Sequence, residues 1–186
     1  FFADQFSEKS DYSTPVDFDS ISNTNFYFSS PTVFNFLKDV KPSKAPGPDG
    51  ISAHVLKHCA SSICMPLSML FNKSYLSGQL PPDWKLANVV PIHKKGRKDN
   101  VENYRPISLT SLAMKIFEKC IRIKIFELCK DKISPSQHGF LPNRSCTTQL
   151  LDFSQNLALN LNSGWQTDVV YFDFAKAFDS VNHDVL

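Results

Sequence analysis

The sequence lacks several features that mark common classes of protein. No apolar run approaches the roughly 18 residues that a membrane-spanning helix requires, so we expect no membrane partner. The chain opens on Phe1 and Phe2 without a Met or a basic stretch, so we expect no signal peptide and interpret it as a segment of a longer protein. Gly is scarce, with 6 residues against 12 Pro, which excludes a collagen-like repeat.

The five cysteines contain no C-x-x-C pair and are odd in number. Cys120 and Cys129 fall within an amphipathic stretch, where packed thiols are expected. This usage favours reduced cysteines in an intracellular protein over a disulfide framework. A metal cluster of His54, His58 and the nearby cysteines is disfavoured, because its spacing matches no common zinc pattern.

The composition that is present is that of a folded domain. The 186 residues are 42% hydrophobic and 20% charged, which excludes wholesale disorder and fibrous repeats. A chain of this length suits a single domain, or a domain with a tail. It can bury about 70% of the surface that the unfolded chain exposes.

The total charge of +2 conceals a strong asymmetry along the chain. Residues 85–144 hold 13 Lys and Arg against five acids, net +8, whereas residues 1–40 carry −4 and residues 165–186 carry −3. A basic middle beside an acidic end is typical of a protein that holds a polyanion in one part and metal ions in another. A solvated basic face is the alternative, and charge alone does not separate the two.

Periodicity and turn residues predict a chain of mixed helix and strand. Residues 1–40, rich in Phe, Ser, Asp and Asn, show poor periodicity and predict a linker whose aromatic side chains anchor on a neighbouring surface. The Pro/Gly cluster at residues 41–50 stops regular structure. The elements expected after it are a helix from Ser52 to Cys59, a helix ending at Gly78, strands at 86–92 and 104–110, helices at 112–130 and 147–162, and a strand at 168–174.

The two middle strands enclose the basic loop HKKGRKDN at residues 93–100. Such a pair predicts a β-hairpin that carries positive charge at its tip. Pro91 and Pro106 each remove a backbone donor and therefore favour edge positions.

The apolar stretch VVYF at residues 169–172 delivers Asp173 to the end of the last expected strand. A carboxylate held there can bind a divalent cation such as Mg²⁺, which prefers oxygen ligands. Phosphoryl transfer to a growing nucleic acid uses two such ions about 4 Å apart. A simple turn residue is the alternative for Asp173 when it is considered alone.

Four blocks of the sequence occur together in one known family. The blocks are APGPDGI at 45–51, NVVPIHKKG with ENYRPISLTS at 88–96 and 102–111, QHGFLPNRS at 137–145, and VVYFDFAKAFDSVNHDVL at 169–186. In content and order they resemble the reverse transcriptases of non-LTR (LINE-type) retrotransposons, in particular the Jockey and CR1-like branches. The resemblance covers roughly residues 41–186.

The resemblance implies roles for the residues around the last strand. Asp173 is similar to the first catalytic, metal-binding aspartate of the family, and the backbone carbonyl of Phe174 would be a second ligand. Phe178 is similar to the steric gate that selects deoxynucleotides by leaving no room for a 2′-hydroxyl. Ordinary core packing is the alternative for Phe178.

The hairpin blocks imply contacts with the nucleotide and the template. Lys94 and Arg105 are similar to the basic pair that holds the incoming triphosphate, and Lys95 is the alternative to Lys94 because one residue of loop slip exchanges them. Lys95, Arg97 and Lys98 would contact the template backbone, or only solvent.

The block at 137–145 would lie near the template strand and the nucleotide. The residues that match it there are Gln137, Gly139 and Phe140, and a plain turn is the alternative for them.

The implied fold is α+β, a right-hand polymerase of which this chain would hold only the fingers and first palm strand (truncated). Residues 1–40 would be an N-terminal linker or extension, and residues 41–186 the reverse transcriptase domain. The chain has no Asp-Asp dipeptide and ends thirteen residues after Asp173, so the family's second catalytic block is missing. We therefore expect this fragment alone to be inactive.

The implied function is that of an RNA-directed DNA polymerase of a retrotransposon, working by two-metal nucleotidyl transfer. Its cofactor would be Mg²⁺, as two ions in the complete enzyme, with Mn²⁺ as the alternative. Its partners would be an RNA template, a DNA primer or target and dNTPs, with an endonuclease domain elsewhere in the same polyprotein and a location in nucleus and cytoplasm. The alternatives are a non-catalytic nucleic-acid-binding remnant and a maturase-like protein of the same fold.

Overall fold

The computed structural model describes residues 26–174, 177 and 181. The described residues up to Leu128 form one compact unit, and those from Cys129 onwards form another. We call them the first and the second unit and describe each by itself. None of the helices among the described residues combines the length and the hydrophobicity of a membrane-spanning segment.

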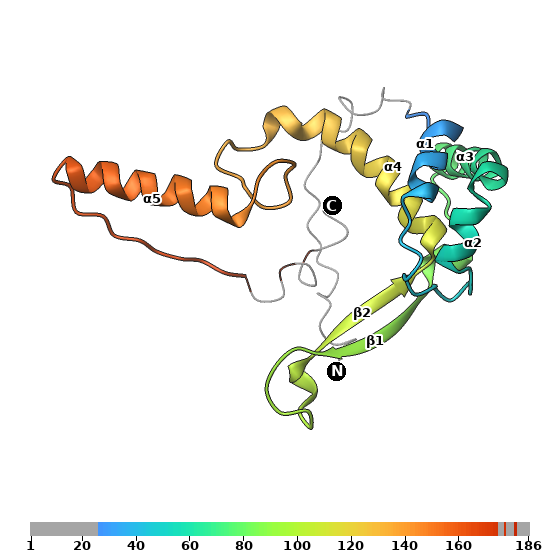
Figure 1. Ribbon diagram of the computed structural model, residues 1–186, viewed down its shortest axis with the longest axis horizontal. Helices are drawn as coiled ribbons and strands as arrows, with labels where there is room; N and C mark the ends of the chain where they lie inside the picture. Colours follow the sequence, from blue (N-terminus) through green and yellow to red (C-terminus); the bar gives the residue numbers. More distant parts are fainter. Residues whose placement is uncertain (1–25, 175–176, 178–180, 182–186) are drawn as a thin grey trace, which may run out of the picture. The chain divides into compact units, whose positions relative to one another are not determined.

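The elements of both units are helices except for one hairpin (Figure 1). The helices are α1 (Ser30–Lys38), α2 (Ala53–His58), α3 (Ala60–Ser77), α4 (Leu112–Cys129) and α5 (Cys146–Asn162). The strands are β1 (Ala87–His93) and β2 (Tyr104–Thr110), with short 3₁₀ turns at Pro82–Lys85, Val101–Asn103 and Lys130–Lys132. The prediction of mixed helix and strand is confirmed.

The core of the first unit lies among α1, α3 and α4 (Figure 1). Phe71 of α3 and Phe117 of α4 are almost fully buried, and their rings stack with centroids 4.9 Å apart. Phe28 meets Phe117 edge to face at 5.4 Å. Val33 and Leu37 of α1 lie one helical turn apart and belong to the same core, and neither residue has any exposed surface. The three buried rings therefore contribute strongly to the stability of this unit, together with the aliphatic residues around them.

Helix α1 corrects the expectation that residues 1–40 contain no regular element. Its sequence does carry start signals, because the hydroxyl of Ser29 accepts from the backbone N–H of Thr32 and Pro31 stands in the first turn. These signals are local, and the poor periodicity of the longer segment conceals them. The aromatic anchor expected in this region is Phe28, which packs in the core. The domain boundary at residue 40 stays a prediction.

The segment before α1 is fastened to α3 by side chains. The amide of Asn72 accepts from the backbone N–H of Phe28 at 2.9 Å and donates to its carbonyl at 2.9 Å. The hydroxyl of Ser68, which is buried, donates to the same carbonyl at 2.6 Å. Both backbone groups of a buried residue are thus satisfied without a strand.

Predicted helix limits agree closely with those observed after residue 50. The hydroxyl of Ser52 accepts from the N–H of Val55 and caps α2, as the sequence indicated. Gly78 ends α3 in the left-handed conformation, with φ of 66°. Helices α4 and α5 each begin or end within one residue of the expected limits.

Strands β1 and β2 form a two-stranded antiparallel hairpin that extends away from the helices of its unit (Figure 1). The predicted hairpin is confirmed, and Pro91 pairs with Pro106 in its register. Neither Pro can donate, so this pair occupies a position where the two strands exchange no hydrogen bond. Both strands lie at a sheet edge, as the prolines indicated.

The Pro/Gly turn of residues 41–50 packs against the base of the hairpin. A Cβ on Gly47 would lie 2.5 Å from the backbone nitrogen of Ser111 and 2.6 Å from the carbonyl carbon of Thr110. Only Gly permits this approach of two backbones. Ser111 is itself fully buried, so the contact joins the turn to the start of α4.

In the second unit, residues 168–174 have no strand assignment, which corrects the expected final strand. A β-strand requires a neighbour whose backbone groups pair with its own. The only strands among the described residues are β1 and β2. The apolar, β-branched composition of this segment is therefore not sufficient for a strand here.

Candidate functional site

The register of the hairpin places Lys94 and Arg105 on one face. Arg105 is opposite Ile92, and side chains of directly opposed residues share a face. The backbone N–H of Lys94 donates to the carbonyl of Asn103 at 2.7 Å, so the pairing continues one residue beyond the strand. Lys94 lies two positions from Ile92 and is therefore the diagonal neighbour of Arg105. Both cations are exposed.

The loop at the hairpin tip is ordered by side-chain contacts to its own backbone. The amide of Asn103 donates to the carbonyl of Arg97 at 2.8 Å, and the hydroxyl of Tyr104 donates to that of Lys98 at 2.9 Å. A ring nitrogen of His93 lies 3.0 Å from the carbonyl oxygen of Gly96, whose φ of 78° favours glycine. The loop cations are thus carried by a defined turn.

The cations of this loop differ in how far they are already paired. Arg97 forms a bidentate ion pair with Asp99, at 2.7 and 3.2 Å. Within the part of the chain that the structure describes, Lys94, Lys95 and Lys98 form no ion pair. The Arg97 pair is exposed and so of small energetic value. Arg97 is nevertheless less available to a phosphate than the three lysines.

The block at residues 137–145 forms a loop before α5. The side chain of Gln137 donates to the carbonyl of Gly139 at 3.1 Å. Phe140 has φ of 64° and Asn143 has φ of 59°, both in the left-handed region that a bulky residue rarely adopts. Phe140 is 85% exposed. The loop therefore presents an aromatic side chain from a constrained backbone.

A hydrogen-bonded network that the sequence did not reveal supports this loop. His138 is 8% exposed and contacts Thr148 in the first turn of α5 and Arg144 in the loop. The presence of His and Arg in one motif was the available signal. Their pairing depends on the fold of an irregular loop, which no periodicity encodes.

Asp173 is an exposed residue of the second unit that lies outside any helix or strand. The segment that leads to it runs alongside α5, with the rings of Phe153 and Tyr171 6.2 Å apart. Among the described residues, no group of three His, Cys, Asp or Glu could hold a metal ion. Phe178 lies outside the described residues. Lys94 and Arg105 belong to the first unit, and Asp173 to the second.

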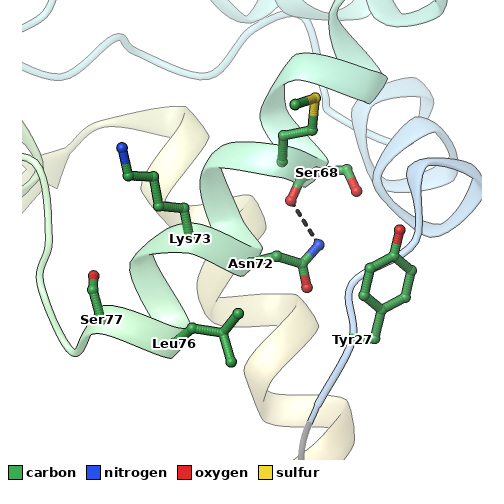
Figure 2. A pocket seen from close by; sticks show the side chains of 7 residues that line it. Tyr27, Ser68, Asn72, Lys73, Leu76 and Ser77 are labelled. Atoms are coloured by element: carbon green, nitrogen blue, oxygen red, sulfur yellow. Dashed lines mark hydrogen bonds between the residues drawn. The ribbon is translucent and has the colours of Figure 1, made fainter.

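A shallow cavity of about 560 Å³ lies between α3 and Tyr27, which precedes α1 (Figure 2). Tyr27, Met69 and Leu76 supply its apolar lining, and Lys73 is its one charged residue. It contains none of the residues singled out from the sequence.

Comparison with known families defines the class of the protein. Residues 92–186, half of the chain, match the family described as reverse transcriptase (RNA-dependent DNA polymerase). The chain belongs to this family. The match includes Arg105, the loop before α5 and the segment that carries Asp173.

Particular relatives are transposon proteins of Drosophila melanogaster. The chain is 31% identical over 156 residues to the RNA-directed DNA polymerase from mobile element jockey, covering 81% of this chain and 17% of that protein. It is 30% identical over 144 residues to the probable RNA-directed DNA polymerase from transposon X-element, covering 76% and 16%. For transposon BS the identity is 28% over 153 residues, covering 81% and 17%. The chain thus spans about a sixth of each relative, and the resemblance to non-LTR retrotransposon reverse transcriptases is confirmed.

Proposed function

We propose that this chain contributes the nucleotide-holding fingers and the first catalytic carboxylate of an RNA-directed DNA polymerase of a retrotransposon. The fold would be the right-hand polymerase, with residues 41–186 as the fingers and the start of the palm. The observation that carries the proposal is the shared hairpin face of Lys94 and Arg105 in a chain of the reverse transcriptase family.

The two cations suit an incoming triphosphate for different reasons. The ammonium of Lys94 is a point charge, whereas the guanidinium of Arg105 offers a planar fork for two phosphate oxygens. Since the register makes them diagonal neighbours, one polyphosphate can contact both. Lys95 is one residue beyond Lys94, in a bend, and lacks this relation to Arg105. The geometry therefore favours Lys94 for the nucleotide and leaves Lys95 for the template.

Asp173 offers donor chemistry that fits Mg²⁺, or Mn²⁺ as an alternative, because carboxylate and carbonyl oxygens are preferred ligands of such ions. The Asp173 carboxylate and the Phe174 carbonyl would hold one ion. Bound metal would neutralise charge on the reacting phosphate groups. One carboxylate cannot hold two ions, so we propose that further carboxylates come from elsewhere in a longer polypeptide.

The remaining assignments concern selectivity and the nucleic acid. Phe178 would exclude the 2′-hydroxyl of a ribonucleotide. Lys98 would contact the template backbone, with Arg97 contributing less because of its pair with Asp99. Phe140 would offer its ring to an unpaired base, since stacking on aromatic side chains is sequence-tolerant.

The proposal extends to the RNA template, DNA primer and dNTPs as partners, an endonuclease domain in the same polypeptide, and a location in nucleus and cytoplasm.

The proposed function is tested by replacing Asp173 in the complete protein encoded by the reading frame. We expect Asp173→Ala to abolish primer extension on an RNA template while RNA binding persists. Asp168→Ala, five residues earlier on the same exposed segment, is the matched control and should retain extension. Undiminished extension by Asp173→Ala would refute the metal-site assignment. Salt-sensitive RNA binding by a wild-type protein that never extends a primer would instead favour a binding remnant.

The assignment of the basic pair has its own test. Lys94→Ala and Arg105→Ala should each raise the KM for dNTP by roughly tenfold, because each removes a charge-assisted contact to the triphosphate. Lys95→Ala, with the same loss of charge in the same loop, should leave that KM within about twofold. A large effect of Lys95→Ala with none of Lys94→Ala would exchange the two assignments.

A further inference from the structure

The loop before α5 is held by one buried imidazole that is bonded on both sides. Nδ1 of His138 lies 2.9 Å from the hydroxyl of Thr148, and Nε2 lies 3.2 Å from Nη1 of Arg144. The same Nη1 donates to the carbonyl of Pro135 at 2.7 Å. The hydroxyl of Thr148 in turn donates to the carbonyl of Ser145, the N-cap of α5. The network therefore joins the first arm of the loop, its middle and the helix that follows.

The chemistry of the partners determines the form of the imidazole. A guanidinium can only donate, so Nε2 of His138 must accept. A neutral ring that accepts at Nε2 carries its proton on Nδ1, which then donates to Thr148. The hydroxyl of Thr148 can accept this bond because its own proton is directed to Ser145. All of these bonds are mutually consistent only in this tautomer.

The network surrounds the part of the loop that is most constrained. Gln137 and Gly139 flank His138, and Phe140 comes one residue later. Phe140 and Asn143 have left-handed backbones. A left-handed Phe is unfavourable in a free loop and persists only where the surroundings determine it. The bonds from Arg144 to His138 and Pro135 bring the two arms of the loop together on either side of these residues.

Arg144 has a simpler alternative role as a direct phosphate ligand, since it is exposed and belongs to the basic region. Two observations favour the internal role. One of its terminal nitrogens uses both of its hydrogens on loop acceptors, and one of these acceptors is a buried ring. A buried imidazole nitrogen left without its donor would be unfavourable.

We propose that His138 and Arg144 are positioning residues that hold the Gln137–Phe140 turn in the conformation in which it contacts the template. This inference rests on the proposed function, because it assumes that the chain binds an RNA template. Neither residue is assigned a contact with the reacting atoms. Their effect on synthesis would pass through the loop.

Two substitutions of His138 separate the contributions of its nitrogens. His138→Gln can retain an acceptor near Nε2 for Arg144, whereas His138→Asn can retain a donor near Nδ1 for Thr148 but loses the Arg144 contact. In the complete protein, we expect His138→Asn to weaken RNA template binding by about tenfold, which corresponds to one lost hydrogen bond to a charged group. His138→Gln should stay within about threefold of wild type. Equal affinity of all three proteins would overturn the proposal.

Salt dependence separates positioning by Arg144 from a direct phosphate contact. Arg144→Ala should weaken template binding by about tenfold without changing the slope of log K against log salt concentration. Lys98→Ala, which removes a proposed phosphate contact, should reduce that slope by about 1. Arg144→Lys keeps the charge but not the planar donor and should weaken binding like Arg144→Ala. A reduced slope for Arg144→Ala, together with full binding by Arg144→Lys, would make Arg144 a phosphate ligand and overturn the proposal.

The imidazole itself gives a readout that does not depend on activity. Long-range ¹H–¹⁵N spectra of the 186-residue chain should show His138 as the Nδ1–H tautomer, and Arg144→Ala should abolish that preference. A wild-type Nε2–H tautomer would overturn the network. If the complete wild-type protein binds no RNA, the proposed function fails; if it binds RNA and the variants bind equally well, only this inference fails.

Discussion

Helices α4 and α5 have almost the same length and both are amphipathic, yet the apolar side chains of α4 are buried and those of α5 are not. Helix α4 buries Phe117, Ile116 and Cys120, together with two residues of its first turn. Helix α5 buries none of its side chains. Among the described residues of the second unit, His138 is the one buried side chain, whereas the first unit has a hydrophobic core from Phe28 to Cys120.

An amphipathic pattern thus specifies which face of a helix is apolar but not the surface that covers it. Helix α4 finds α3 and the segment before α1 within its own unit, through contacts of Phe117 with Phe71 and Phe28. No comparable surface lies within the described second unit. Its large exposed apolar side chains include Leu150, Leu151, Leu159, Leu161, Trp165, Val170, Tyr171, Phe172 and Phe174. So many large apolar side chains left exposed in one unit are more than the scattered few that need no explanation on a protein surface.

The largest effect should come from the centre of the first unit. Phe117→Ala removes a ring that packs on both Phe28 and Phe71, and we expect a loss of about 3–5 kcal/mol in the free energy of unfolding. Hydrogen exchange of the whole chain should show lost protection from α1 to α4. Protection in α5 should change little. An equal loss of protection in both units would show that they unfold together and would contradict the contrast between α4 and α5.

An intermediate effect should follow from the buried thiol of the same helix. Burial raises the pKa of Cys120 from 9.0 to about 11, opposed in part by the positive charge of Lys119. The folded chain therefore holds this proton more tightly than the unfolded chain, so stability is full below about pH 9 and falls as the pH rises towards 11. Between pH 8 and 10.5 we expect Cys120 to account for a loss of about 2 kcal/mol.

Urea unfolding under reducing conditions, with helix content as the signal, would measure this loss. Cys120→Ala should remove the contribution of this thiol to the pH dependence of the free energy of unfolding. Cys129→Ala, at an exposed position near the end of the same helix, should leave the dependence unchanged. If both variants kept the full dependence, the raised pKa of Cys120 would not contribute.

The smallest effect should be found in the second unit. Leu159→Ala shortens a side chain that is more than half exposed, and both residues favour helix, so the free energy of unfolding should change by no more than about 0.5 kcal/mol. The helix signal during urea unfolding of the chain is the measurement. A loss above about 2 kcal/mol would mean that α5 is packed as α4 is.

Local signals were sufficient to predict most elements. Ser52, Gly78 and the two short stretches that enclose the basic loop defined α2, the end of α3 and the hairpin to within about a residue. Helix α1 was missed because its cap and its two core residues lie within a long segment of poor periodicity. The prediction of a strand at residues 168–174 was wrong. A strand needs a second strand to pair with, and the composition of a segment does not reveal whether such a partner is present.

In the candidate site, too, some features could be predicted from sequence motifs and others depended on the path of the chain. The motif singled out Lys94 and Arg105, and the register places Lys94, rather than Lys95, diagonally beside Arg105 on one face of the hairpin. Their role with a nucleotide stays a prediction. The pairing of His138 with Arg144 could not be predicted, because it depends on the path of an irregular loop. Roles for Asp173 and Phe178 stay predictions.

The pairing of Pro91 with Pro106 has a consequence for how the hairpin behaves among other chains. At a pair without mutual hydrogen bonds, the backbone groups of both residues face outward, so each outer edge lacks one donor at the same level. A foreign strand that adds to either edge would leave one of its own carbonyls unsatisfied there. The hairpin exposes Val89, Val90 and Ile92, which would otherwise favour such addition. Pro91 and Pro106, placed opposite each other, thus disfavour the addition of a further β-strand to either edge of the hairpin.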